Sequence, residues 1–149
     1  MTQIDRKELT APCGIDCFNC QVLESNITEE TRRRIAERRG VDPSLVSCRG
    51  CRVQGGYCVL VDSCETLECV RSKGVSFCFE CGEFPCLKLA PAQEGAAVFP
   101  HNMKVFNLCR MKAVGVGKWA EEEASRIRDL YYTGRFVPGS GPVDREPGN

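Results

Sequence analysis

The spacing of apolar and polar residues predicts short helices joined by turns, with little strand. Residues 27–39 have the pattern of a helix that begins after Asn26, its expected N-cap, and ends at Gly40. A second short helix is expected over 64–73, where Gly74 ends it. Both predicted helices lie among the turns of the N-terminal part of the chain.

Longer periodic segments follow in the C-terminal part. Residues 103–114 predict a helix with few polar positions that ends at Gly115. Residues 118–132 predict an amphipathic helix. One face of that helix would carry Ala120, Ala124, Ile127 and Tyr131. From Val137 onward the chain is rich in proline and glycine, which is typical of disorder.

These patterns predict a small mixed α+β fold that is helix-rich. In it, a turn-dominated cysteine-rich region packs on a few helices. We expect a lead-in segment over 1–12 and a single domain over 13–135. Within the domain, 13–86 is rich in cysteine and 87–135 is helical. Residues 136–149 are expected to form a disordered tail.

Composition adds one unusual feature, because 12 of the 149 residues are cysteine. The chain starts with charged residues, and no stretch reaches the ~18 apolar residues of a membrane span. We therefore expect a cytoplasmic protein with no membrane partner. In that reducing compartment, dense cysteines favour metal ligation or redox chemistry over disulfides.

The spacing of the cysteines is the strongest chemical signal. Two residues between two cysteines let one tight turn direct both sulfurs at a tetrahedral metal, each at ~2.3 Å. Gly82 can close such a zinc knuckle in the left-handed conformation. The pairs with this spacing are Cys17/Cys20, Cys48/Cys51 and Cys78/Cys81. The first two pairs could together form one four-cysteine site across the helix between them.

Eleven cysteines lie within 13–86, which predicts at least two metal ions. Buried cysteines that serve only as small hydrophobic residues do not need such turn-type pairs. How these cysteines divide into sites stays open. The candidate metal ligands are Cys13, Cys17, Cys20, Cys48, Cys51, Cys58, Cys64, Cys69, Cys78, Cys81 and Cys86.

Two further residues could extend such a site but are expected to lie outside it. Cys109 falls in the middle of a predicted helix with Phe106 and Ala113 on one face, which favours packing in the core. His101 is the only histidine, and we expect it to be solvent-exposed near a helix start.

Zinc and iron–sulfur chemistry both use four thiolates, so both remain open. Cys13-x3-Cys17-x2-Cys20 has the spacing that radical S-adenosylmethionine enzymes use, but this chain lacks their long barrel domain. Zinc is favoured because knuckle turns explain the pairs more simply. The chain also shows no βαβ pattern of the kind a thiol–disulfide oxidoreductase needs.

Charge patterning gives little support to other functions. The segment Thr31–Arg39 holds five arginines, which would suit nucleic acid, yet basic and acidic residues balance at 20 each. Pairs such as Glu30–Arg34 favour a solvated helix face instead. The chain has one histidine and no recognised phosphate-binding loop, so no combination of catalytic residues can be proposed. We therefore lean against an enzyme.

The ordered motifs resemble the DUF3795 family of small, cysteine-rich bacterial and archaeal proteins without a characterised function. The resemblance covers about residues 10–115. It implies that all eleven candidate ligands match the cysteine frame of the family, although Cys58-x5-Cys64 is wider than expected. The motifs that carry it are Cys13-Gly-Ile-Asp-Cys17-Phe-Asn-Cys20, Cys48-Arg-Gly-Cys51, Cys64-x4-Cys69 and Cys78-Phe-Glu-Cys81-Gly-Glu-Phe-Pro-Cys86.

The sequence therefore predicts a metal-binding protein with structural zinc in cysteine-rich sites. Zinc closed by four thiolates has no open position for a substrate, so an interaction module with an unknown protein partner is expected. The alternative is an iron–sulfur redox protein or enzyme accessory. A nucleic-acid binder is the least favoured of the three.

Overall fold

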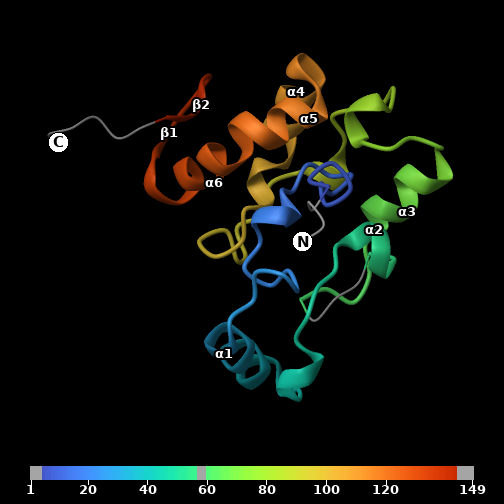
Figure 1. The fold of residues 1–149 in the computed structure, drawn as a ribbon. Helices are drawn as coiled ribbons and strands as arrows, with labels where there is room; N and C mark the ends of the chain where they lie inside the picture. The colour runs from blue at the N-terminus through green and yellow to red at the C-terminus, as the bar shows by residue number, and fades with distance from the viewer. Residues whose placement is uncertain (1–4, 57–59, 144–149) are drawn as a thin grey trace, which may run out of the picture.

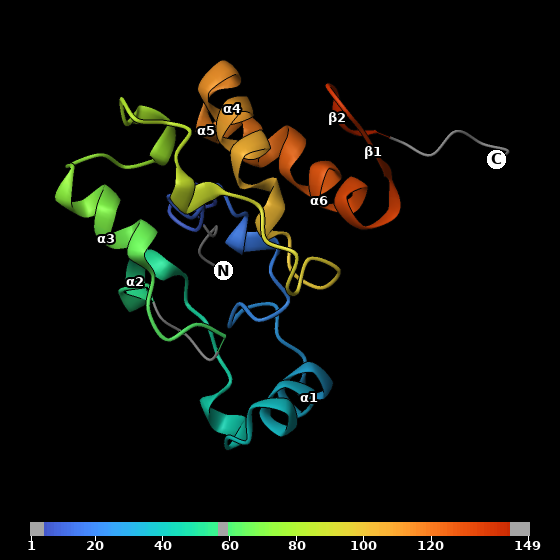
Figure 2. The same ribbon diagram turned by 180° about the vertical axis from the view of Figure 1, so that it is seen from behind.

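The structure, a computed structural model, describes residues 5–56 and 60–143 (Figure 1). In both views α1 lies at the opposite end of the molecule from α4 to α6, with the N-terminal segment running between them and α2 and α3 at one side (Figures 1 and 2). The α-helices are α1 (Glu29–Arg39), α2 (Cys51–Gln54), α3 (Glu65–Ser72), α4 (Lys104–Val114), α5 (Val116–Lys118) and α6 (Ala124–Thr133).

Single turns of 3-10 helix occupy much of the remaining chain. They are η1 (Cys17–Asn19), η2 (Pro43–Leu45), η3 (Cys78–Glu80), η4 (Leu87–Leu89) and η5 (His101–Met103). Such turns are short because their hydrogen bonds are poorer than those of an α-helix. The cysteine-rich region is therefore turn-dominated, as its sequence predicted.

The first long helix has a different N-cap from the expected one. The hydroxyl of Thr28 accepts a hydrogen bond from the Thr31 N–H at 3.2 Å, so Thr28 is the N-cap and the prediction of Asn26 is wrong. The Asn26 amide instead donates to the carbonyls of Phe18 (2.8 Å) and Cys20 (3.0 Å). Asn26 thus stabilises the first cysteine turn, and the helix starts two residues further on.

The predicted helix over 118–132 is interrupted. Helix α5 leads into η6, a π-helical segment over Trp119–Glu123, and α6 continues the chain. Of the predicted apolar face, Ala120, Ala124 and Ile127 are buried, and Tyr131 is partly buried. The apolar face of this segment was therefore predicted correctly. The switch to π-helical hydrogen bonds over Trp119–Glu123 was not, because it leaves the spacing of apolar residues unchanged.

Two hydrophobic cores hold these elements together. In the larger core the Phe18 ring from the first cysteine turn packs edge-to-face on Trp119, with centroids 6.1 Å apart. Its buried members are Phe18, Leu67, Val70, Phe77, Cys78, Leu89, Met103, Leu108, Met111, Trp119, Ala120, Ala124 and Ile127. The smaller core lies under α1 and consists of Val22, Ile35, Ala36 and Val46.

A small sheet follows α6. Strands β1 (Arg135–Val137) and β2 (Gly141–Val143) pair antiparallel, with Phe136 opposite Pro142. This hairpin lies where the sequence predicted a disordered tail, because Gly139 at φ 85° allows the tight turn that joins the strands. Residues 144–149 lie outside the described residues. The described residues are helix-rich and form one two-stranded sheet, which confirms the predicted mixed fold class.

None of the helices described here is long and apolar enough to cross a membrane.

Candidate metal centres

Two of the three cysteine pairs adopt the same turn. Each begins with a 3-10 turn, η1 or η3, whose first residue is a cysteine. The second cysteine, Cys20 or Cys81, is extended, at φ −74° and ψ 132° or φ −79° and ψ 136°. Its N–H donates to the carbonyl of the first cysteine, at 3.0 Å or 3.1 Å. The third pair has the same spacing but a different geometry, because Gly50 has φ 94° and α2 begins at Cys51.

Backbone and side-chain donors approach the sulfurs of two cysteines. The Cys81 sulfur accepts from the Glu83 N–H and from the Lys73 ammonium, both at 3.4 Å. The Cys48 sulfur accepts from the Gly50 N–H at 3.4 Å. In both pairs the N–H belongs to the second residue after the cysteine. Such donors stabilise a thiolate, the form of cysteine that binds metal.

Four cysteines meet around one cavity of about 330 Å³. They come from α3, from both ends of the η3 turn and from the residue that precedes η4. We call this set, Cys69, Cys78, Cys81 and Cys86, the cavity group.

Two lysines line the same cavity. Lys73 forms an ion pair with Glu83 at 2.6 Å, and Lys88 forms one with Glu65 at 3.2 Å. Hydrogen bonding to Glu83 raises the pKa of the Lys73 ammonium, which keeps it charged. The cavity group therefore has two ammonium groups beside it, each paired with a carboxylate.

A second set of thiols influences one another's pKa values. Burial, with the nearby sulfurs of Cys13 and Cys64, raises the pKa of the Cys51 thiol to about 11. Burial raises the pKa of Cys17 well above its ordinary value, and the charges of Cys51 and Cys13 add to that rise. We call this set, Cys13, Cys17, Cys51 and Cys64, the core group.

The two remaining described ligand candidates lie elsewhere. Cys20 and Cys48 pack against the smaller core. Leu23 pairs with Cys48 in a parallel bridge, and the Glu24 N–H donates to the Cys48 carbonyl at 2.7 Å. The segments that carry the first two cysteine pairs thus meet at the Leu23–Cys48 bridge, and the four-cysteine site expected of these pairs stays a prediction. Cys58 lies outside the described residues.

In the part of the chain that the structure describes, no three His, Cys, Asp or Glu side chains form a group that could hold a metal ion as they stand. The eleven cysteines among those residues are all free. Metal binding by the candidate ligands therefore stays a prediction.

The prediction for Cys109 is wrong, because its side chain is exposed. Helix α4 turns Leu108 and Met111 into the larger core, and Cys109 lies about 100° around the helix from Leu108. His101 begins η5, just before α4, and is partly buried. Its Nε2 lies 3.0 Å from the Ala92 carbonyl oxygen.

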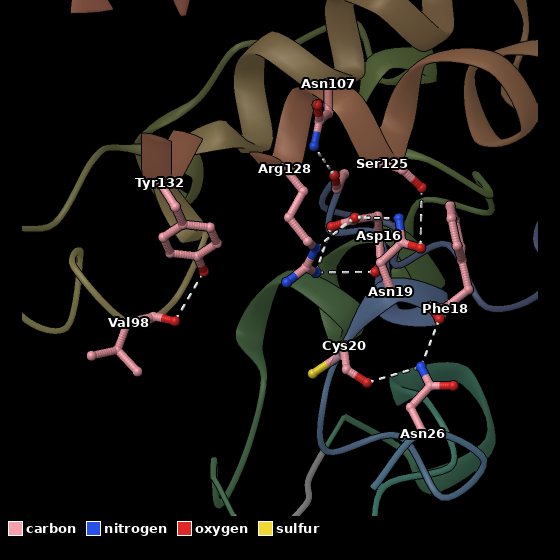
Figure 3. A network of polar contacts seen from close by, with 11 residues as sticks. Asp16, Phe18, Asn19, Cys20, Asn26, Val98, Asn107, Ser125, Arg128 and Tyr132 are labelled. Carbon is pink, nitrogen blue, oxygen red and sulfur yellow. Dashed lines mark hydrogen bonds and ion pairs between the residues drawn. The ribbon is translucent and has the colours of Figure 1, made fainter. Parts of the chain in front are cut away.

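A buried ion pair fixes the first cysteine turn (Figure 3). The Asp16 carboxylate accepts two hydrogen bonds from Arg128 of α6, at 2.7 Å and 2.6 Å, and one from the Asn19 amide at 2.8 Å. The Asp16 side chain is only 3% exposed. Sequence reasoning missed this pair, because α6 lies more than a hundred residues further along the chain.

Arg52 stabilises the segment next to the pair Cys78/Cys81, as Arg128 stabilises the first cysteine turn. Its guanidinium donates to the carbonyls of Thr10 (3.1 Å) and Ser76 (2.8 Å) and stacks over the Phe77 ring, 4.7 Å from its centroid. The Glu80 carboxylate accepts from the Ser76 and Phe77 N–H groups at 2.7 Å and 3.0 Å. These contacts connect α2 to the segment that carries η3.

The fold and these clustered thiols define a small, cysteine-rich, helical protein. The chain belongs to the DUF3795 family of proteins of unknown function, whose model matches residues 9–91. The comparisons found no match among curated proteins or among solved structures. The matched region contains every candidate ligand, from Cys13 to Cys86, and ends before α4.

Proposed function

We propose that this chain is a metal-binding protein in which the cavity group holds a metal ion. The observation that carries the proposal is that four cysteines line one cavity. They are separated by up to 17 positions along the chain, so their meeting results from the fold and not from local spacing alone.

Zinc is the metal that this donor set suits best. A set of four thiolates favours soft or borderline ions, and zinc takes it in a closed tetrahedral site. The knuckle at Cys81, with its N–H donor from Glu83, is typical of such sites. A zinc ion with four thiolates has two net negative charges, and the Lys73 ammonium, 3.4 Å from the Cys81 sulfur, would stabilise them.

The role that follows is structural. Bound zinc would supply a cross-link between α3, η3 and the start of η4, with no open coordination position. The proposed protein is therefore an interaction module that presents a metal-stabilised surface to a protein partner. Leu87, next to Cys86, is 93% exposed and would belong to that surface.

An iron–sulfur cluster is the second candidate, because four cysteines are also the usual ligand set of such clusters. The cavity group offers four cysteines at one cavity.

Metal analysis of the full chain, purified without oxygen, tests the proposal. We expect at least two zinc ions per chain and a colourless protein, because eleven candidate ligands can serve two closed sites. Iron with a similar amount of acid-labile sulfide, and a brown colour, would show that the bound group is an iron–sulfur cluster and not zinc. A chain that binds neither would contradict the proposal.

A matched pair of variants adds a site-specific control. Cys81→Ser should lower the metal content, since Cys81 belongs to the cavity group. Cys109→Ser should leave the metal content unchanged, because Cys109 is exposed on α4. Equal metal loss in the two variants would show that the cavity group is not the ligand set.

A further inference from the structure

We propose that a second cavity of this chain binds a small monocarboxylic acid with an apolar body. The cavity has a volume of about 530 Å³ and is lined by residues of η4, η5, α4, α6 and the β1–β2 hairpin. It shares Leu89 with the cavity of the cysteines. Binding at this site needs no metal, so its failure and the failure of the proposed function are distinguishable.

Apolar side chains make up most of the walls of this second cavity. Leu89 and Met103 belong to the larger core, and each presents part of its side chain to the cavity. Val105 of α4 and Leu130 of α6 add to the same walls. Cavities of this size, with mostly apolar walls and a few polar groups, are typical binding sites for small molecules.

The loop that precedes η5 is fixed by two polar side chains that also line the cavity. The Asn102 side chain holds Ala92 at both backbone groups, because its Oδ1 accepts from the Ala92 N–H at 2.9 Å and its Nδ2 donates to the Ala92 carbonyl at 3.0 Å. The Tyr131 hydroxyl donates to the Ala96 carbonyl at 2.7 Å. These hydrogen bonds hold the wall in place without a ligand, so little order has to be gained when one binds.

The C-terminal hairpin forms another side of the cavity and lies tightly against α4. A Cβ at Gly141 would come within 2.6 Å of the Phe106 ring, so the missing side chain lets β2 approach α4 this closely. Pro142 and its cross-strand partner Phe136 both line the cavity. Phe136 is nevertheless 75% exposed. An aromatic side chain this exposed at the edge of a cavity is apolar surface that a ligand would cover.

Arg135 of β1 determines which charge the ligand should carry. Among the described residues that line the cavity, it is the one charged side chain. A guanidinium matches the two oxygens of a carboxylate in a bidentate pair. A single cation, with no lining carboxylate among those residues, favours one negative charge over a phosphate dianion or an amine. Because Arg135 is exposed, the carboxylate would lie at the mouth of the cavity and the apolar body inside it.

Calorimetric titration of the full chain with straight-chain probes tests the ligand class. Octanoate should bind, and hexanoate should bind about tenfold more weakly because it buries two fewer CH₂ groups. Octanol has the same chain without the charge and should bind about 3- to 10-fold more weakly than octanoate. Octanol that binds as tightly as octanoate would overturn the carboxylate, and a chain that does not bind octanoate would overturn the site.

Methyl NMR spectra of the wild-type chain locate the bound octanoate without any variant. The signals of Met103 and Leu130, which line the cavity, should shift during the titration. The signals of Val22 and Val46, in the smaller core, should stay unchanged. Shifts that leave out Met103 and Leu130 would overturn the site. So would a chain whose cavity residues shift only as it dimerises, because a second copy would then cover this face.

A matched pair of variants tests the role of the arginine. Arg135→Gln should weaken octanoate binding about 3- to 10-fold and leave octanol binding unchanged, since octanol carries no charge. Arg126→Gln removes an exposed arginine of α6 and should change neither. Equal effects of the two variants on octanoate would overturn the pairing with Arg135. Metal content should be the same in both variants and in the wild-type chain, because the cysteines are untouched.

Discussion

At the scale of single residues, Asp16 shows how a cysteine loop depends on a distant helix. A buried carboxylate is costly unless a cation and hydrogen-bond donors compensate it. Arg128 supplies two short hydrogen bonds in a fork, and Asn19 supplies a third. The side chains of Asp16 and Arg128 are 3% and 16% exposed, so water screens their attraction little. The ion pair therefore fixes the position of the first cysteine turn.

Asp16→Asn should lower the free energy of unfolding by about 3–5 kcal/mol, because it leaves the charge of Arg128 buried without its partner. Urea unfolding of the metal-free chain measures this loss. The matched control is Glu122→Gln, which removes an exposed ion pair with Lys118 and should cost less than about 1 kcal/mol.

The double variant Asp16→Asn/Arg128→Gln checks the cause of that loss. It removes both charges, so it should be more stable than Asp16→Asn alone. A double variant at least as unstable as the single one would mean that the unpaired charge is not the origin of the effect.

At the scale of elements, the sequence predicted the helix bounds that depend on neighbouring residues in the chain. Helix α1 ends at Gly40, which has φ 64°, and α4 occupies almost the whole predicted segment. Predictions that depend on the environment of a residue were less successful. Cys109 was assigned to the core although its helix faces it outward, and the turn of the C-terminal hairpin did not suggest strands.

The candidate site divides in the same way. The Cys-x-x-Cys spacing predicted the turns at η1 and η3, but the same spacing at Cys48 and Cys51 leads into a helix instead. It could not predict that Cys69 would join Cys86 at one cavity, since this depends on how α3 packs. The grouping of cysteines is thus a tertiary property, and one sequence leaves many groupings possible.

Helix α1 gives a prediction about its arginines. Arg33, Arg34 and Arg38 are exposed, so changing all three to Gln should leave metal content unchanged and alter the free energy of unfolding by less than about 0.5 kcal/mol. Arg32 differs, because its guanidinium donates to the Val46 carbonyl. The matched variant Arg32→Gln should therefore cost about 1–3 kcal/mol. Thermal and urea unfolding measure both.

The same triple variant tests the nucleic-acid reading. If the arginine face is only solvated, any weak binding of the chain to DNA should keep the same salt dependence after the change. Steep salt dependence in the wild-type chain that flattens in the triple variant would instead assign phosphate contacts to α1. Fluorescence anisotropy at several salt concentrations measures the slope.

At the scale of the whole molecule, the cysteine region and the C-terminal helices are one structure. The family match ends at residue 91, but the most buried side chains of the larger core include Leu108, Met111 and Trp119, which follow it. Phe18, from the first cysteine turn, packs on that tryptophan. Burial between these parts raises the pKa values of four thiols, Cys13, Cys17, Cys51 and Cys78.

This burial gives the metal-free protein a pH dependence of defined sign. In the folded chain the pKa of Cys51 is about 11 and that of Cys78 about 12, while an unfolded cysteine titrates near ~8.5. Between these values the unfolded chain has lost thiol protons that the folded chain keeps. The free energy of unfolding of metal-free protein should therefore fall as the pH rises from about 8.5 to about 11.

Urea midpoints at pH 8 and pH 10, in a reducing buffer with a chelator, measure this fall. The midpoint should be lower at pH 10. Zinc-loaded protein is the control, because metal-bound cysteines are thiolates already and should contribute no such fall. Below neutral pH the free energy of unfolding of zinc-loaded protein should instead fall as the pH falls, because protons compete with zinc for the sulfurs. A metal-free chain with equal midpoints at pH 8 and pH 10 would show that its thiols are not buried in solution as the fold places them.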